Sequence, residues 1–100
     1  MFTLYALEQQ QAANRTRVEI LASILKVAST GTLKTHIMYR ANLSHRQLEK
    51  YLAFLEENGM LEQVLDDEVR KYCVTQKGVD FLKDFDRLSG YLSQERNSLT

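Results

Sequence analysis

Proline is absent from this sequence of 100 residues, and neither an internal repeat nor a linker segment interrupts it. A chain of this length without a linker is expected to form one domain. Cys73 is the single cysteine, so no disulfide can form within the chain, and a reducing compartment inside the cell is expected. Its position in a run of strand-forming residues predicts a buried packing role for this side chain.

Long apolar runs are also missing. No stretch approaches the roughly 18 apolar residues that a membrane-spanning helix needs, so no membrane partner is expected. The apolar segment 1–7 is short, and it lacks the basic leader and the cleavage site of a signal peptide. These absences predict a cytoplasmic protein.

Motifs for catalysis do not occur in the sequence. There is no glycine-rich phosphate loop, nucleophile elbow or paired acid and base motif. His36 and His45 are nine positions apart without a nearby cysteine, which is not the ligand spacing of a zinc site. The acidic run 66–68 could attract a cation, but such runs are usually solvated surface loops. We therefore expect no enzyme activity, no cofactor, no metal and no small-molecule substrate.

Charge of one sign is not in excess, because 13 basic residues balance 13 acidic ones. General DNA-packaging proteins normally carry a strong positive excess, so this balance argues against that role. The distribution is uneven, however. Residues 1–55 carry a net charge of +4 and residues 56–100 a net charge of −4. Such a dipole would orient the protein on a polyanion, with its basic half toward the polymer.

The clearest pattern that is present lies in residues 32–61. Ser44 stands at an N-cap position, and Gln47 three residues later completes a capping box. Apolar residues then follow the i, i+3, i+4, i+7 spacing of a buried helical face. This face consists of Leu48, Tyr51, Leu52 and Leu55. Asn58 followed by Gly59 is expected to end the helix, because glycine accepts the left-handed conformation of a C-cap.

A shorter helix is expected just before it, over residues 34–41. Ile37, Met38 and Ala41 can face a core there, and Asn42 is suited to the turn that follows. A helix of about two turns, a brief turn and a longer capped helix match the helix-turn-helix layout. In that layout the second helix lies in the major groove of DNA. Residues 44–58 are therefore the predicted recognition helix.

The flanking segments complete the expected fold. A helix beginning at Arg15 or Arg17 has a core stripe made of Val18, Leu21, Ile24, Leu25 and Ala28, and residues 29–31 stop it. Two β-rich runs, 60–65 and 69–74, form a hairpin around a loop at 66–68. Thr75 caps a last helix that runs from about residue 76 into the low nineties. Residues 1–14 fit either a helix or an irregular extension.

Three helices and a two-stranded wing predict an α+β, mainly α fold, the winged helix-turn-helix. The chain also resembles the archaeal winged-helix regulator family over about residues 16–90. The resemblance rests on IMY at 37–39, ANLS at 41–44, YL at 51–52, GML at 59–61 and YCVTQKG at 72–78. It implies a small dimeric DNA-binding protein that pairs through an antiparallel coiled coil of its last helix. The acidic wing tip, the N-terminal extension and the neutral net charge depart from the family pattern.

The last helix carries a second apolar pattern. Phe81, Phe85, Leu88 and Leu92 recur at spacings of 4, 3 and 4, as in a coiled-coil seam. With Tyr91 they form the expected homodimer interface, whereas Val79 and Leu82 are expected to pack on the chain's own core. The chain thus divides into an N-terminal extension (1–14), a winged-helix DNA-binding domain (15–78) and a C-terminal dimerisation helix (79–100).

The expected contacts to double-stranded DNA come from both helices of the helix-turn-helix and from the wing. They are Lys34, Thr35, His36, Tyr39, Arg40, Ser44, His45, Arg46, Gln47, Glu49, Lys50, Arg70 and Lys71. Arg46 can pair with guanine, and Gln47 with adenine if capping does not use it. Glu49 can orient Arg46 or accept from cytosine. The remaining residues are expected to position phosphates, although Tyr39 fits the core equally well.

These patterns predict a sequence-selective, dimeric transcriptional regulator associated with the nucleoid. Two alternatives remain. A winged helix can serve as a protein-interaction module, and the acidic half of this chain would suit a basic partner. It can also be an architectural chromatin protein with little sequence preference.

Overall fold

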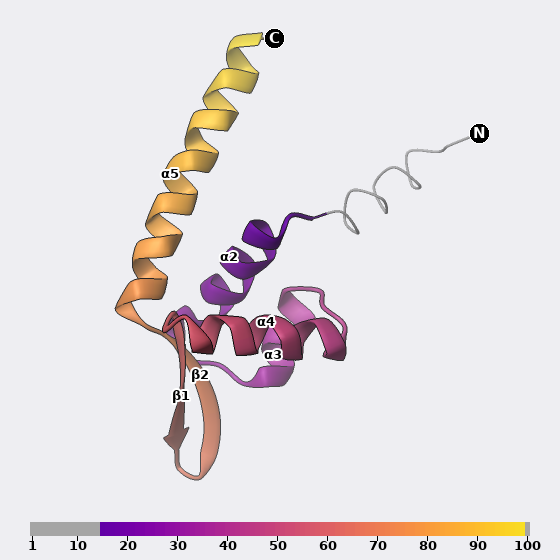
Figure 1. Ribbon diagram of the computed structural model, residues 1–100, viewed down its shortest axis with the longest axis vertical. Helices are drawn as coiled ribbons and strands as arrows, with labels where there is room; N and C mark the ends of the chain where they lie inside the picture. The colour runs from indigo at the N-terminus through magenta and orange to yellow at the C-terminus, as the bar shows by residue number, and fades with distance from the viewer. Residues whose placement is uncertain (1–14, 100) are drawn as a thin grey trace, which may run out of the picture.

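The computed structural model describes the backbone of residues 15–99 and the side chains of residues 15–92. Its elements are α2 (Arg17–Val27), η1 (Ala28–Thr30), α3 (Lys34–Arg40), α4 (His45–Glu57), β1 (Leu61–Asp66), β2 (Val69–Val74) and α5 (Gln76–Leu99). The hairpin and α5 extend in opposite directions from the body formed by α2, α3 and α4 (Figure 1). This arrangement confirms the predicted mainly helical winged-helix fold. The prediction for 1–14 lies outside the described residues.

Helix α2 begins one residue after Thr16, whose hydroxyl accepts a hydrogen bond from the Glu19 amide at 3.1 Å. Its buried face agrees with the predicted stripe at Leu21, Ile24, Leu25 and Ala28. The prediction for Val18 was wrong, because this side chain is 46% exposed. Val18 lies in the first turn, at the margin of a buried face that includes Ile20 instead. The spacing of apolar residues therefore predicted the centre of the buried face correctly but not where that face ends.

The wing is a two-stranded antiparallel sheet in which Leu61 pairs with Val74 and Asp66 with Val69. Because Asp66 belongs to the ladder, the loop contains only Asp67 and Glu68, one residue fewer than expected. Both have positive φ, 51° and 64°, as the central residues of a primed hairpin turn do. The turn matches the right-handed twist of the strands. Asp67 tolerates this backbone region better than most residues, whereas Glu68 tolerates it poorly.

A backbone bridge joins the wing to the segment before α3. The Thr32 amide donates to the Tyr72 carbonyl at 3.0 Å, and the Tyr72 amide donates to the Thr32 carbonyl at 2.8 Å. The Tyr72 side chain is buried in the core with Leu61. Cys73 faces the other side of the strand and is half-buried, so its predicted burial was only partly correct.

The base of α5 is held against the end of the hairpin. The Thr75 hydroxyl accepts from the Gly78 amide at 3.2 Å, which confirms the predicted cap, and it donates to the Gly59 carbonyl at 2.6 Å. The helix reaches Leu99 and is longer than predicted. None of the helices in the described part of the chain has the length and apolar character needed to cross a membrane.

Candidate nucleic-acid interface

The capped end of α4 (residues 44–47) is fixed by the predicted capping box. The Ser44 hydroxyl accepts from the Gln47 amide at 3.2 Å, and the Ser44 amide donates to the Gln47 side-chain oxygen at 3.1 Å. His45 and Arg46 are exposed in this first turn. Since capping occupies the Gln47 side-chain oxygen, a bidentate contact of Gln47 with adenine would require the box to open.

Arg15 holds the turn that precedes the capped end. Its guanidinium donates to the carbonyls of Ala41 and Asn42 at 2.8 and 3.2 Å. Asn42 adopts φ 55°, as a turn residue in the left-handed region does, and Ala41 is buried. Arg15 thereby links the start of α2 to the turn between α3 and α4. This role of Arg15 was not predicted, because its partners lie 26 and 27 positions away in the sequence.

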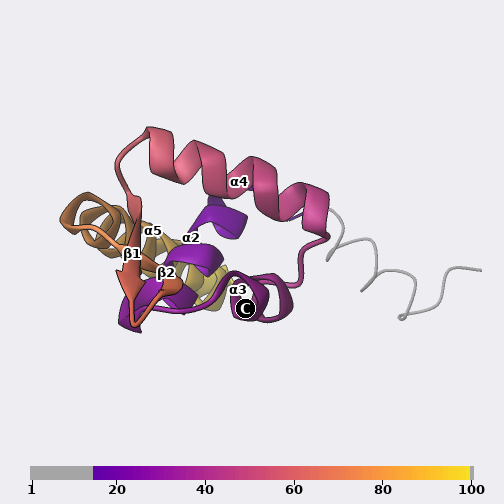
Figure 2. The ribbon, with the colours of Figure 1, turned by 90° about the horizontal axis from the view of Figure 1, so that it is seen from below.

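Four of the predicted contact residues on α3 are exposed, and Lys34 is half-buried. The exposed residues are Thr35, His36, Tyr39 and Arg40. The Tyr39 side chain is 79% exposed, so it belongs to the surface and not to the core. Ile37 fills the core position of this helix. In Figure 2, α4 and α3 lie apart, and the segment that connects them is at one end of α4. The Arg40 end of α3 and the capped end of α4 therefore meet at the same side of the molecule.

Glu49, in the middle of α4, is contacted by Lys34 and His45. Lys34 forms an ion pair with its carboxylate, and the His45 Nε2 lies 3.5 Å from the same oxygen. The hydrogen bond from Lys34 lowers the pKa of the Glu49 carboxyl and raises the pKa of the Lys34 ammonium. Glu49 is therefore directed toward α3 rather than toward Arg46, and Lys34 is partly neutralised before any ligand arrives.

The two predicted wing contacts have acidic surroundings. The Lys71 ammonium is 3.1 Å from the Asp66 carboxylate. Arg70 lines a hollow of about 400 Å³ between α4 and the wing, together with Glu49, Glu56 and Glu57. Among the described residues, Arg40 on α3 and Arg46 and Lys50 on α4 are exposed and form no ion pair, whereas both wing cations lie close to carboxylates.

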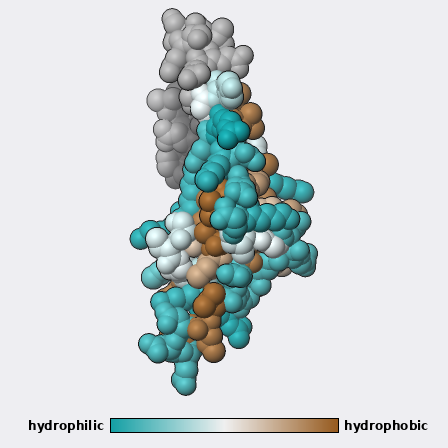
Figure 3. All heavy atoms as spheres, turned by 90° about the vertical axis from the view of Figure 1, so that its left-hand side faces the viewer, coloured by the Kyte–Doolittle hydropathy of each residue, from teal (hydrophilic) through white to brown (hydrophobic). Residues whose placement is uncertain are grey.

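The predicted dimer seam is divided between two environments. Phe81 packs against the core of its own chain, where only Val79 and Leu82 were expected, and Lys26 lies over the Phe85 ring at 5.4 Å. Lys26 also pairs with Asp86 at 3.2 Å, so α2 holds this half of the helix. After Asp86, three large apolar side chains of α5 are exposed. Their exposed fractions are 60% for Leu88, 67% for Tyr91 and 56% for Leu92. Figure 3 shows an interrupted apolar stripe along the face that carries α5 and the wing.

Comparison with known proteins identifies related sequences. A family model described as winged helix-turn-helix matches residues 14–92. An uncharacterised protein from the archaeon Methanocaldococcus jannaschii is 40% identical over 50 residues, which cover 49% of this chain and 52% of that protein. The match thus spans about half the length of this curated relative.

Solved structures share the fold at low sequence identity. Sso10a-2, a DNA-binding protein from Sulfolobus solfataricus, has a TM-score of 0.68 at 23% identity, covering 85% of this chain and 93% of its own. MepR, a transcription regulator of a Staphylococcus aureus multidrug efflux pump, has a TM-score of 0.72 at 16% identity, with coverage of 99% and 85%. The reduced transcriptional regulator YodB from Bacillus subtilis has a TM-score of 0.66 at 17% identity and 94% coverage of both chains. At these identities the likeness establishes the fold.

Proposed function

Because this chain belongs to the winged helix-turn-helix family, we propose that it binds double-stranded DNA as a sequence-selective dimeric regulator of transcription on the nucleoid. The observation that carries the proposal is the capped end of α4, where a closed capping box presents His45 and Arg46 to solvent. The descriptions of Sso10a-2 as DNA-binding and of MepR and YodB as regulators support it. No catalytic step or cofactor forms part of the proposal.

In the proposed complex, the first two turns of α4 enter the major groove. Arg46 makes a bidentate contact to guanine, and Lys50 and His45 contact phosphates. The C-terminal end of α4 carries Glu56 and Glu57, which DNA phosphates would repel. The helix therefore approaches the groove by its N-terminal end, as recognition helices of this layout do.

The outer face of α3 supplies the remaining positioning contacts. His36, Tyr39 and Arg40 are exposed on the same helix and lie beside the turn into α4. Contacts of this kind to phosphate fix the register of a protein on the duplex without reading sequence. The wing has a minor part, since its tip is acidic and Lys71 is paired with Asp66.

Two copies are proposed to pair through the exposed half of the α5 seam. Leu88, Tyr91 and Leu92 leave a large apolar surface in solvent, and a partner helix would bury it. A dimer presents two recognition helices to two half-sites about one duplex turn apart, which predicts an inverted repeat as the target. Phe81 and Phe85 contribute only at the margin, because their own chain already covers part of each.

Selection of bound sites from a random duplex pool tests sequence reading, and enriched inverted repeats are the expected result. On the selected site, Arg46→Ala should weaken binding by roughly 1–3 kcal/mol and relax one base position. Lys83→Ala, the matched loss of one exposed charge on α5, should leave affinity nearly unchanged. Affinity of the wild type should fall steeply as salt rises, because counterions leave the phosphates on binding.

Sedimentation of the free protein tests the dimer separately. Replacing Leu88 and Leu92 together by Glu should give a monomer, because buried carboxylates would destabilise the interface. The same substitution at Val64, which is 41% exposed on the wing, serves as the control and should remain dimeric. If the variant with Glu at positions 88 and 92 is still a dimer, α5 does not form the dimer interface.

A protein-interaction module is the second candidate, and the wing tip favours it. Leu65 and Val69 are 70% and 44% exposed there, next to the acidic residues Asp67 and Glu68. Such a surface suits a partner with apolar and basic side chains. Absence of any DNA shift at low salt would favour this candidate. Tight binding without enrichment of a sequence would instead indicate architectural binding to DNA.

A further inference from the structure

A groove of about 340 Å³ runs between α2 and α4, beside the recognition helix. It falls within the volume range of small-molecule sites, which begins at roughly 300 Å³. Arg17 and Leu21 line it from α2, and Lys50, Tyr51 and Phe54 line it from α4. Of these residues, only Lys50 is among the predicted DNA contacts.

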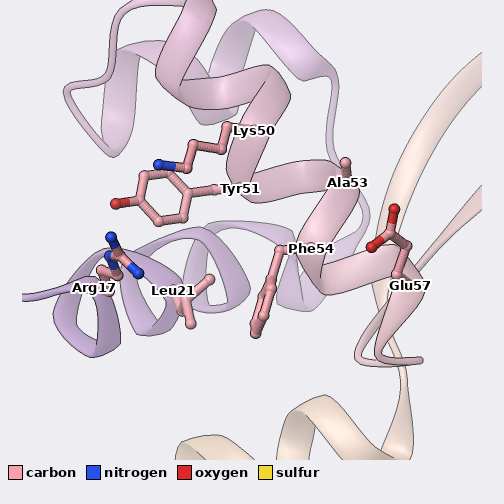
Figure 4. Close-up of a pocket in the computed structure, with 7 residues that line it drawn as sticks. All are labelled: Arg17, Leu21, Lys50, Tyr51, Ala53, Phe54 and Glu57. Atoms are coloured by element: carbon pink, nitrogen blue, oxygen red, sulfur yellow. The ribbon is translucent and has the colours of Figure 1, made fainter.

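The middle of the groove is apolar. Leu21 is buried and Tyr51 is half-buried, while Phe54 lies outside the predicted core stripe and is 46% exposed. Figure 4 shows Leu21 and Phe54 projecting into the space between the two helices from opposite sides. Leaving this surface in water costs free energy that an apolar ligand would recover by covering it.

One end of the groove gathers hydrogen-bond donors. In Figure 4 the Lys50 ammonium, the Tyr51 hydroxyl and the Arg17 guanidinium converge there, and Glu57 lies at the opposite end. The Lys50 Nζ is 6.0 Å from the centre of the Tyr51 ring. The groove is therefore polarised, with two positive charges at one end of an apolar floor.

We propose that this groove binds a small amphipathic carboxylate, with its apolar body on Leu21 and Phe54 and its carboxylate between Arg17 and Lys50. A planar guanidinium and an ammonium both form strong charge-assisted hydrogen bonds with a carboxylate. A cation of the same shape would be repelled at the donor end. A fully polar anion would leave the apolar floor exposed, so the charge and the apolar body are both required.

Calorimetry without DNA tests the site, using 2-naphthoate as the probe and 2-naphthamide as its neutral analogue. The wild type should bind one 2-naphthoate per chain, about tenfold more tightly than the amide, because only the carboxylate gains charge-assisted hydrogen bonds. The double variant Arg17→Gln, Lys50→Gln should lose this preference while still binding the apolar body. Lys77→Gln with Lys83→Gln, the matched removal of two exposed charges from α5, should keep it.

A variant of the apolar floor separates binding in the groove from general attraction of anions. Phe54→Ser should weaken 2-naphthoate and 2-naphthamide alike, because it removes shared contact area. Equal affinity of the two probes for the wild type would overturn the proposal, and so would unchanged binding in Phe54→Ser. Binding that appears only after removal of residues 1–14, or only on dilution, would assign the groove to the chain's own segment or to a second copy.

The ligand should also compete with DNA, and this part rests on the proposed function. Lys50 cannot hold a carboxylate and a phosphate with full strength at the same time. In a DNA shift assay, 2-naphthoate should weaken binding by the wild type about tenfold at saturation and should have little effect on Arg17→Gln. If the protein binds no duplex DNA, the proposed function is refuted. Ligand binding in the groove is still tested by calorimetry, which uses no DNA.

Discussion

The capped end of α4 and the tip of the wing (residues 66–69) are both exposed, but they are built in opposite ways. The capped end has a closed capping box, and Arg15 holds the turn before it through two carbonyls. The wing tip has two non-glycine residues at positive φ and three consecutive carboxylates. The end with fixed geometry is also the end with positive charge, as the proposed contact with a rigid polyanion requires.

The wing is instead fixed at its base. Thr32 pairs with Tyr72, and Thr75 bonds to Gly59 where the hairpin meets α5. Gly78 is buried at this junction, where an added Cβ would lie 2.4 Å from the Met60 carbonyl oxygen. The difference indicates that the hairpin is fixed to the rest of the fold through its base, and that the charge of its tip is not constrained by these contacts.

The base of the wing should give the largest effect. Gly78→Ala should destabilise the protein by roughly 1–3 kcal/mol, because the methyl group must displace backbone in a packed junction. Denaturation with urea measures the free energy of unfolding. Gly90→Ala is the control, since a Cβ there meets nothing within 4 Å, and it should be neutral or stabilise the helix by up to about 1 kcal/mol. Equal stability of Gly78→Ala and the wild type would refute the role given to the base.

The anchor of the capped end should give the next effect. Arg15→Met keeps much of the side-chain length but removes both hydrogen bonds to the turn, and should cost about 1–2 kcal/mol of stability. Amide hydrogen exchange at Asn42 and Leu43 should become faster, because the turn opens more often. Arg17→Met, an exposed arginine in the same region, should leave exchange at these amides unchanged.

The wing tip should become more stable when its backbone strain is relieved. Glu68→Gly places glycine at a positive φ in an Asp-Gly turn, and should raise stability by roughly 0.5–1 kcal/mol. Glu68→Ala removes the same charge without relieving the backbone, so it separates strain from electrostatics. A gain of equal size in both variants would assign the effect to charge repulsion.

The smallest effect is expected from the ion pair on α4. Glu49→Gln frees Lys34 and removes a negative charge from the proposed DNA-binding surface. The affinity for duplex DNA at neutral pH should therefore rise roughly two- to fivefold. Glu57→Gln, the same change near the far end of α4, should have less effect on this affinity.

The same ion pair should make the stability of the fold depend on pH. Because Lys34 lowers the pKa of Glu49, the pair stabilises the fold at neutral pH, and this stabilisation is lost as pH falls through that lowered pKa. Stabilities of the wild type and Glu49→Gln should therefore converge in acid.

The capped end of α4 was predictable because its determinants are close in sequence. Ser44 and Gln47 are three residues apart, and the turn at Asn42 and the helix end at Gly59 depend on single backbone preferences. The hairpin followed from two β-rich runs around a short loop. Each of these predictions used the physics of a few neighbouring residues, and each was confirmed to within a residue or two.

The contacts that join distant segments could not be predicted in this way. Arg15 reaches carbonyls 26 and 27 positions away, and its choice of partner depends on how α2 packs beside the turn. The same is true of Phe81, which packs on its own core because α5 lies against α2 and the hairpin. Val18 was misplaced for a related reason, since helical spacing defines a stripe but not how far neighbouring elements cover it.

The order of the local elements, their caps and the separation of charge along the chain were determined by the amino-acid sequence itself, because hydrogen-bonding and steric preferences act over a few residues. Tertiary structure alone decided that Lys34 pairs with Glu49, that the cations of the wing lie close to carboxylates, and that Arg17 and Lys50 share a groove. These outcomes depend on the angles at which helices pack, and packing angles come from the summed contacts of the whole core rather than from any one segment.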